Sequence, residues 1–177
     1  MLSLAERGYG RACAAAVAAA DPASDIIAFM DGDGADRADL IDQLLAPIRA
    51  GTHAFVLAAR TRALREPGSM SPHQVLAGHA LGLAIGLATG TSYTDMCAFR
   101  AIRRDALSAL NMQEMTYGWN IEMQIKAARA GLRILEIPLP YRRRAGGKSK
   151  VAGSLHGTIR ASTRIIATFL RVVSAKP

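Results

Sequence analysis

The sequence predicts a layered α/β domain with a mainly parallel sheet and flanking helices, followed by a basic amphipathic helix at the C-terminal end. Short apolar runs that suit buried strands alternate along the chain with segments of helical periodicity. The length of 177 residues fits one domain, or one domain with an appendage, and a hydrophobic fraction of 50% excludes a disordered chain. We therefore assign residues 1–150 to the domain and residues 151–177 to the terminal helix.

The first half of the chain predicts two helices and two strands. Residues 11–20 are nearly all alanine, a strong helix former, and residues 36–50 place their leucines on one side of a helix that a glycine terminates. Residues 26–30 form a short apolar run that leads to an aspartate, and residues 55–59 form a second run that leads to an arginine. Both runs are typical of buried strands.

The second half continues this alternation. A polar loop with two prolines, residues 61–72, precedes the most apolar run of the chain, residues 75–89. This run is shorter than the about 20 residues that a membrane span needs, so we interpret it as a buried or interface-lying helix and keep transmembrane insertion as the lesser alternative. Residues 97–102 and 134–137 predict two further strands, and residues 120–130 predict a helix that ends at a glycine.

The net charge of +8 is concentrated in the last part of the chain. Lys and Arg number 22, Asp and Glu number 14, and no acidic residue follows Glu136. The basic residues beyond that point are Arg142, Arg143, Arg144, Lys148, Lys150, Arg160, Arg164, Arg171 and Lys176. The sequence therefore describes a near-neutral body with a basic tail.

Residues 154–175 predict the basic amphipathic helix of that tail. On a helical wheel, one arc is apolar and contains Leu155, Ile159, Ile166, Phe169, Leu170 and Val173. The opposite arc contains Arg160, Arg164 and Arg171. Two interpretations explain the pattern equally well: the apolar arc packs on the domain, or the helix lies on an anionic membrane surface.

Composition also limits the compartment and the kinds of site. Cys13 and Cys97 are far apart and no C-x-x-C motif is present, which disfavours a structural zinc site and suits a reducing cytosol. Residues 1–10 contain charges and no apolar core, so they do not resemble a secretory signal. We expect a cytoplasmic location, peripheral at the inner face of the cell membrane if the terminal helix binds lipid.

Asp31 and Asp33 directly follow the first predicted strand, with Gly32 between them. Ligands of open α/β sheets bind at the carboxyl ends of the strands, and two carboxylates there can share a hard divalent cation that neutralises a diphosphate. The alternative is a simple Asp-Gly turn, with Asp36 as the cap of the next helix. An EF-hand is excluded because Ala35 and Asp36 occupy the fifth and sixth loop positions.

Residues 141–150 form the densest positive cluster, and Gly146 and Gly147 make it mobile. Guanidinium, ammonium and hydroxyl groups together are typical of phosphate recognition, and a solvated surface loop is the alternative. Tyr141 is the single aromatic residue in this cluster, which disfavours a nucleic-acid partner. We therefore favour a discrete phosphate ligand.

These segments, taken in order, resemble the family 2 glycosyltransferases, and among them the dolichol- and polyprenyl-phosphate sugar transferases. The resemblance covers nearly the whole chain and is most specific in its last motif. The matching stretches are Arg7-Gly8-Tyr9-Gly10, Phe29-Met30-Asp31-Gly32-Asp33, Ala59-Arg60, Thr94-Asp95-Met96-Cys97-Ala98-Phe99-Arg100 with Arg103-Arg104, Trp119-Asn120-Ile121-Glu122, and Tyr141-x-x-Arg144-x-x-Gly147-x-Ser149-Lys150.

The resemblance implies a GT-A-like fold and an inverting transfer of a hexose from a UDP- or GDP-sugar to a polyprenyl or dolichol phosphate, or to a similar acceptor. It implies that Asp31 and Asp33 hold Mg²⁺ or Mn²⁺ on the donor diphosphate. The residues implied to bind donor or acceptor phosphates are Arg60, Arg144, Ser149 and Lys150, and those implied at the acceptor side are Asp95 and Glu122. Because an acceptor phosphate is already anionic, Asp95 can orient it rather than deprotonate it.

Three departures from the family pattern reduce the activity that we expect. Ala35 stands where relatives often carry a polar residue near the metal, and Cys97 and Ala98 replace a small hydroxyl residue and a glycine. The first βαβ unit, about 50 residues, has no counterpart, so the chain resembles a partial GT-A domain. The alternative function is therefore a catalytically impaired module that binds a membrane surface or a partner. A nucleotidyltransferase is disfavoured because no Gly-rich loop with a lysine follows a first strand.

Overall fold

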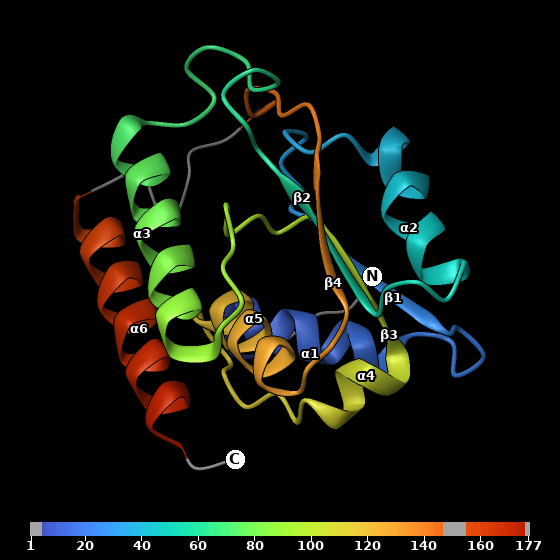
Figure 1. Cartoon of the computed structure of the whole chain (residues 1–177). Helices are drawn as coiled ribbons and strands as arrows, with labels where there is room; N and C mark the ends of the chain where they lie inside the picture. The colour runs from blue at the N-terminus through green and yellow to red at the C-terminus, as the bar shows by residue number, and fades with distance from the viewer. Residues whose placement is uncertain (1–4, 147–154, 176–177) are drawn as a thin grey trace.

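The computed structural model describes residues 5–146 and 155–175, and it contains a four-stranded sheet with helices on both faces (Figure 1). In chain order the elements are α1 (Tyr9–Ala19), β1 (Ile26–Phe29), the 3-10 helix η1 (Ala38–Leu40), α2 (Ile41–Arg49), β2 (Phe55–Ala59), α3 (Pro72–Thr89), β3 (Arg100–Arg103), α4 (Arg104–Ala109), α5 (Trp119–Arg129), β4 (Ile134–Pro138) and α6 (Leu155–Ser174). The predicted alternation of strands and helices is confirmed.

The sheet is mixed, so the expectation of a mainly parallel sheet is confirmed only in part: β1, β2 and β4 run in one direction and β3 runs against them. The strand order is β1-β3-β2-β4, with β3 antiparallel to both of its neighbours and β2 parallel to β4. The reason lies in the return from α3. After that helix the chain comes back to the carboxyl end of β2, where the backbone N–H of Arg60 donates to Asp95 across 3.0 Å. Because β3 starts at the edge where β2 ends, it must run in the opposite direction.

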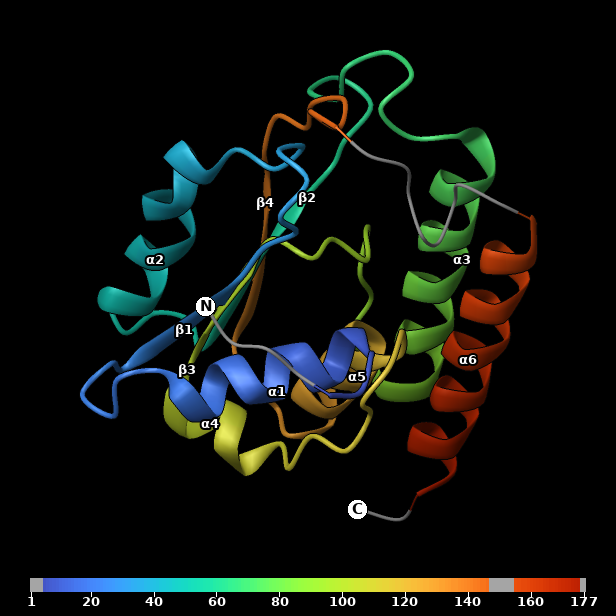
Figure 2. The same ribbon diagram turned by 180° about the vertical axis from the view of Figure 1, so that it is seen from behind.

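Alternate residues of the central strands face two separate apolar clusters. On one face Phe55 and Leu57 pack in a cluster with Trp119 of α5, and α1 and α4 lie on the same side (Figure 2). On the other face Val56 packs with Leu44 of α2. All residues of β2 are buried, which fits its continuous apolar run.

The boundaries of the elements follow the predictions with two main exceptions. The strand β2 matches the predicted residues 55–59 one for one. The strand predicted at residues 97–102 begins only at Arg100, and the Cys97 carbonyl oxygen accepts the Arg100 guanidinium rather than an N–H group of a neighbouring strand. The helix α4 was not predicted because its 6 residues are too few to show a helical period.

The helix α3 starts earlier than its apolar run and presents small residues to the molecule. Ser71 and Gln74 form a capping box, with the backbone N–H of Ser71 donating to the Gln74 amide oxygen across 2.9 Å. A Cβ atom at Gly82 would come within 1.8 Å of the Tyr93 carbonyl oxygen, so this contact requires glycine. No helix among residues 5–146 and 155–175 is long and apolar enough to cross a membrane.

The helix α6 packs on α5, but not with its whole apolar arc. Ala161, Thr168 and Val172 form its buried stripe. Ile159 and Ile166, which the helical wheel placed in the packing arc, are more than half exposed. The packing interpretation is therefore confirmed for one stripe of the helix, and an apolar stripe is left outside. The division of the chain at residue 150 stays a prediction.

Candidate active site

The carboxyl edge of the sheet brings together five of the eight predicted site residues. Asp31 and Asp33 follow β1 and Arg60 follows β2, and these two strands point the same way. Asp95 reaches the same edge from the loop before β3, and Arg144 reaches it from the segment after β4. Ligands bind at this edge in open α/β sheets.

Asp33 links the acidic turn, residues 31–33, to Arg144 in the segment after β4. The Oδ1 atom of Asp33 accepts the backbone N–H of Ala35 at 2.9 Å, and its Oδ2 atom lies 2.9 Å from Nη2 of Arg144. The Asp33 carbonyl oxygen also accepts the N–H of Ala145 at 2.9 Å. Arg144 and Ala145 of the basic segment therefore bond directly to Asp33 of the D-x-D turn. Neither sequence motif by itself indicates this contact.

Asp36 is a member of this site that sequence reasoning considered only as a helix cap. The cap position of the following helix is Arg37, and no side chain caps it. Instead, Asp36 Oδ2 accepts the backbone N–H of Asp31 at 3.4 Å, and Oδ1 lies 3.8 Å from the Cys97 sulfur. Burial raises the pKa of Asp36 to about 6. Its spacing from the D-x-D pair was the signal available in the sequence.

The acidic turn fits a divalent cation held jointly with a ligand. Burial, and then the neighbouring charge of Asp33, raises the pKa of Asp31, so a bound cation would relieve the repulsion between the two carboxylates. Among the described residues, no three His, Cys, Asp or Glu side chains converge to hold a metal ion. A hard cation at Asp31 and Asp33 would complete its coordination with oxygen atoms of water or of a ligand, as Mg²⁺ does when it binds nucleotide phosphates.

Arg60 and Asp95 form a largely buried, bidentate ion pair. The Nε and Nη2 atoms of Arg60 donate to the Asp95 carboxylate at 2.6 and 2.7 Å, and the side chains are only 17% and 10% exposed. Although burial favours the neutral carboxyl, the hydrogen bonds from Arg60 lower the pKa of Asp95. The Arg60 guanidinium also lies 5.0 Å from the centre of the Tyr141 ring, a cation–π contact.

One predicted site residue, Glu122, is not brought to this cluster. Glu122 is fully buried, and its Oε2 atom accepts the backbone N–H groups of Gln113 and Glu114 at 3.0 and 2.6 Å. Its Oε1 atom lies 2.9 Å from the Lys126 ammonium, so in this structure it holds the loop before α5. Ser149 and Lys150 lie outside the described residues.

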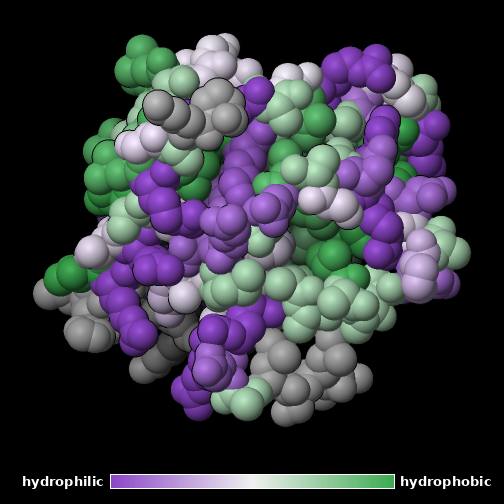
Figure 3. All heavy atoms as spheres, turned by 90° about the horizontal axis from the view of Figure 1, so that it is seen from below, coloured by the Kyte–Doolittle hydropathy of each residue, from purple (hydrophilic) through white to green (hydrophobic). Residues whose placement is uncertain are grey.

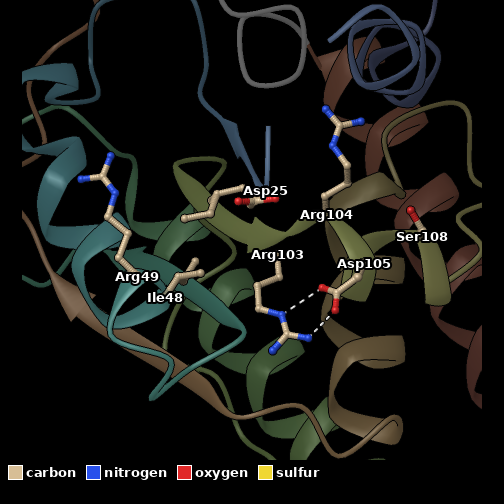
Figure 4. A pocket seen from close by; sticks show the side chains of 8 residues that line it. Asp25, Ile48, Arg49, Arg103, Arg104, Asp105 and Ser108 are labelled. Atoms are coloured by element: carbon tan, nitrogen blue, oxygen red, sulfur yellow. Dashed lines mark hydrogen bonds and ion pairs between the residues drawn. The ribbon is translucent and has the colours of Figure 1, made fainter. Parts of the chain in front are cut away.

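Two hollows border β1, and they differ in their relation to the site. One of about 730 Å³ is lined by Arg49, Arg103 and Arg104 (Figure 4), but these arginines contact carboxylates or carbonyl oxygens of the chain itself. The other, about 390 Å³, lies between α1 and β1 and reaches Asp31. Only the second hollow opens onto the acidic turn, so a ligand can approach the carboxylates from there.

Comparison with known proteins decides the family. The family model described as "Glycosyl transferase family 2" matches residues 2–110, more than half of the chain. The chain belongs to this family. As a family 2 member it is a glycosyltransferase, which is the class that its motifs predicted. Asp31, Asp33, Arg60 and Asp95 lie within the matched residues, whereas Arg144 lies beyond them.

Two relatives are similar to this family 2 chain over most of its length. An uncharacterised glycosyltransferase of Mycobacterium tuberculosis is 33% identical over 168 residues, which cover 94% of this chain and 72% of the relative. The undecaprenyl-phosphate mannosyltransferase of Micrococcus luteus is 30% identical over 141 residues, covering 75% and 56%. These matches confirm the predicted resemblance to the polyprenyl-phosphate sugar transferases.

A solved structure of glucosyl-3-phosphoglycerate synthase from Mycobacterium tuberculosis, in complex with Mn²⁺, UDP-glucose and phosphoglyceric acid, shares the fold. Its TM-score is 0.71 at 21% identity, and the match covers 99% of this chain and 58% of that one. The fold is therefore similar to that of a known glycosyltransferase. The chain spans between half and three quarters of the length of these three proteins.

Proposed function

We propose that this glycosyltransferase moves a hexose, with inversion, from a UDP- or GDP-sugar to a polyprenyl or dolichol phosphate or a similar phosphate acceptor, with Mg²⁺ or Mn²⁺. One observation carries the proposal. A single edge of the sheet holds a pair of aspartates one residue apart and two arginines that are tethered to carboxylates, Arg144 to Asp33 and Arg60 to Asp95. This edge offers separate places for a cation and for more than one phosphate.

The donor end of the site is the acidic turn. Asp31 and Asp33 would hold the cation, which when bound neutralises the diphosphate of the leaving nucleotide. Arg144 is already within 2.9 Å of Asp33 and is positioned to exchange that carboxylate for a phosphate oxygen. Ser149 and Lys150 are proposed to extend this phosphate contact.

The acceptor end of the site is Asp95. Because its pKa is lowered, Asp95 is a carboxylate of weak basicity, which suits an acceptor that is already anionic better than one that must lose a proton. Its role is then to orient the acceptor together with Arg60. The names of two similar proteins support a phosphate-bearing acceptor, since one acts on undecaprenyl phosphate and the other is solved with phosphoglyceric acid.

The outer surface of α3 and α6 supports a lipid-borne acceptor. This apolar face consists of the exposed residues Leu76, Leu83 and Leu87 of α3 and Ile159, Ile166 and Leu170 of α6. The helix α3 contains no Asp, Glu, Lys or Arg. Figure 3 shows hydrophobic side chains gathered on the side of the molecule where Figure 1 places these two helices. We propose that this apolar face rests on the cytoplasmic side of the membrane.

Calorimetric titration of UDP and GDP with and without Mn²⁺ tests the donor end. We expect binding that requires the cation, and at least about tenfold weaker binding in Asp31→Asn and Asp33→Asn, because each removes a charged ligand. Asp42→Asn, an exposed carboxylate on α2, is the matched control and should bind as the wild type does. Cation-independent binding, or equal binding by all three variants, would contradict the proposal.

Product analysis with a labelled donor tests the acceptor end. Undecaprenyl phosphate, dolichyl phosphate and 3-phosphoglycerate are offered in parallel, and we expect a labelled lipid product.

The second candidate function is a membrane-binding module without transferase activity. Binding to anionic vesicles without any binding of UDP or GDP would favour that candidate.

A further inference from the structure

The segment that carries Asp95 has no regular secondary structure, and side chains of other elements hold its backbone. Glu136 of β4 accepts the N–H of Thr94 at 2.9 Å and the N–H of Asp95 at 3.3 Å. The amide of Gln124, on α5, donates to the Asp95 carbonyl oxygen at 3.2 Å. The Arg100 guanidinium, fully buried at the start of β3, donates to the Cys97 carbonyl oxygen.

These contacts replace the hydrogen bonds that a strand or helix would supply. Backbone N–H and C=O groups away from water need partners, and an ionised acceptor makes the stronger bond. Gln124 and Arg100 each hold one carbonyl oxygen, whereas Glu136 holds two successive N–H groups at the position of Asp95 itself. Removing Glu136 therefore releases the part of the segment nearest to the Asp95 carboxylate.

We propose that Glu136 is a positioning residue that fixes the Asp95 segment so that the Asp95 carboxylate meets Arg60. The role in turnover rests on the proposed function, while the structural role does not. Glu136 contacts the backbone of the segment, not the Asp95 side chain. Its carboxylate contacts backbone N–H groups and so sets the direction of the side chain that faces the acceptor.

Amide hydrogen exchange measures the positioning without any substrate. In Glu136→Ala we expect the Thr94 and Asp95 amides to exchange about 10- to 100-fold faster, while amides of β2 keep their rates. Glu136→Gln retains one acceptor oxygen and should restore part of the protection. Asp21→Ala is the matched control, since Asp21 accepts the backbone N–H of Ala23 at 2.9 Å in an exposed turn remote from Asp95.

Turnover then separates a positioning role from a purely structural one. We expect kcat for sugar transfer to fall about tenfold or more in Glu136→Ala with KM for the nucleotide-sugar unchanged, and to recover in part in Glu136→Gln. Unchanged exchange at Thr94 and Asp95 would overturn the proposal, as would equal losses of kcat in the two variants or faster exchange with unchanged kcat. If the wild type shows no transfer, the proposed function fails while exchange alone decides the role of Glu136.

Discussion

At the scale of single residues, the site is organised by arginines that are already paired with carboxylates. Arg60 holds Asp95 through two bonds and Arg144 holds Asp33 through one. A phosphate that binds either arginine has to compete with these carboxylates, so under the proposed function each carboxylate occupies the place of a phosphate. Because the Arg60–Asp95 pair is buried, breaking it should lower the free energy of unfolding more than breaking the Arg144–Asp33 pair.

The pair of Arg60 with Asp95 should show strong energetic coupling. Arg60→Ala should lower the free energy of unfolding by about 3 kcal/mol, because it leaves a buried carboxylate without its partner. Adding Asp95→Ala to this variant should cost little more. Urea denaturation of the two single variants and the double variant measures the coupling energy. The exposed pair of Arg49 with Asp42 is the control, and its coupling should stay below about 1 kcal/mol. Equal coupling in both pairs would contradict the structure.

At the scale of elements, one buried carboxylate binds side chains of α6. Glu114 is 2% exposed and lies in the loop before α5. It accepts the hydroxyl of Thr168 at 3.0 Å and Nε of Arg164 at 3.1 Å, both from α6. Arg164 and Arg171, which the helical wheel assigned to a solvent or membrane face, are thus partly directed into the molecule. This explains why an apolar stripe of α6 can face outward.

Acid should weaken the attachment of α6. Although burial favours the neutral carboxyl, hydrogen bonds from Thr116 and Arg164 lower the pKa of Glu114 to about 2, from an ordinary value of 4.5. A lowered pKa stabilises the fold above the ordinary value, and this stabilisation is lost as the pH falls towards 2. We expect about 3 kcal/mol more stability at pH 6 than at pH 2 from this group.

Chemical denaturation between pH 6 and pH 2 measures this contribution of Glu114. Glu114→Gln should remove it, so the difference between wild type and variant should shrink as the pH falls. The exposed Asp25→Asn serves as the control, and its difference from the wild type should stay the same at every pH. A constant difference between wild type and Glu114→Gln at every pH would show that Glu114 does not act through its charge.

At the scale of the whole molecule, the apolar face of α3 and α6 lies on a different side from α2 and the sheet (Figure 1). The helix α3 turns Gly78 and Gly82 inward and Leu76, Leu83 and Leu87 outward, which is the reverse of a helix that serves only the core. An exposed apolar surface of this kind is an interaction surface in soluble proteins. The proposed function assigns it to the membrane.

Charged substitutions on the apolar face should weaken vesicle binding without unfolding the protein. Leu83→Glu and Ile166→Glu are at positions 60% and 53% exposed, so their effect on the melting temperature should be small. Sedimentation with vesicles of anionic lipid should show at least about tenfold weaker binding. Ala23→Glu adds the same charge in an exposed turn outside this face, and should bind like the wild type. Undiminished binding by both leucine and isoleucine variants would assign the face to another partner.

The sequence by itself determined the order of the strands and of every helix except α4, together with the acidic turn and Arg60, because these depend on local apolar runs and on residues next to strand ends. It also determined the family, since its motifs occur in a recognisable order. The tertiary structure alone decided the reversed direction of β3, the inclusion of Asp36, the inward position of Glu122 and the backbone contacts of Glu136. Each of these is set by contacts between residues distant in sequence or by the direction of a side chain. The hydrophobic periodicity of a sequence indicates which side of an element is apolar. It does not indicate which other element packs against that side.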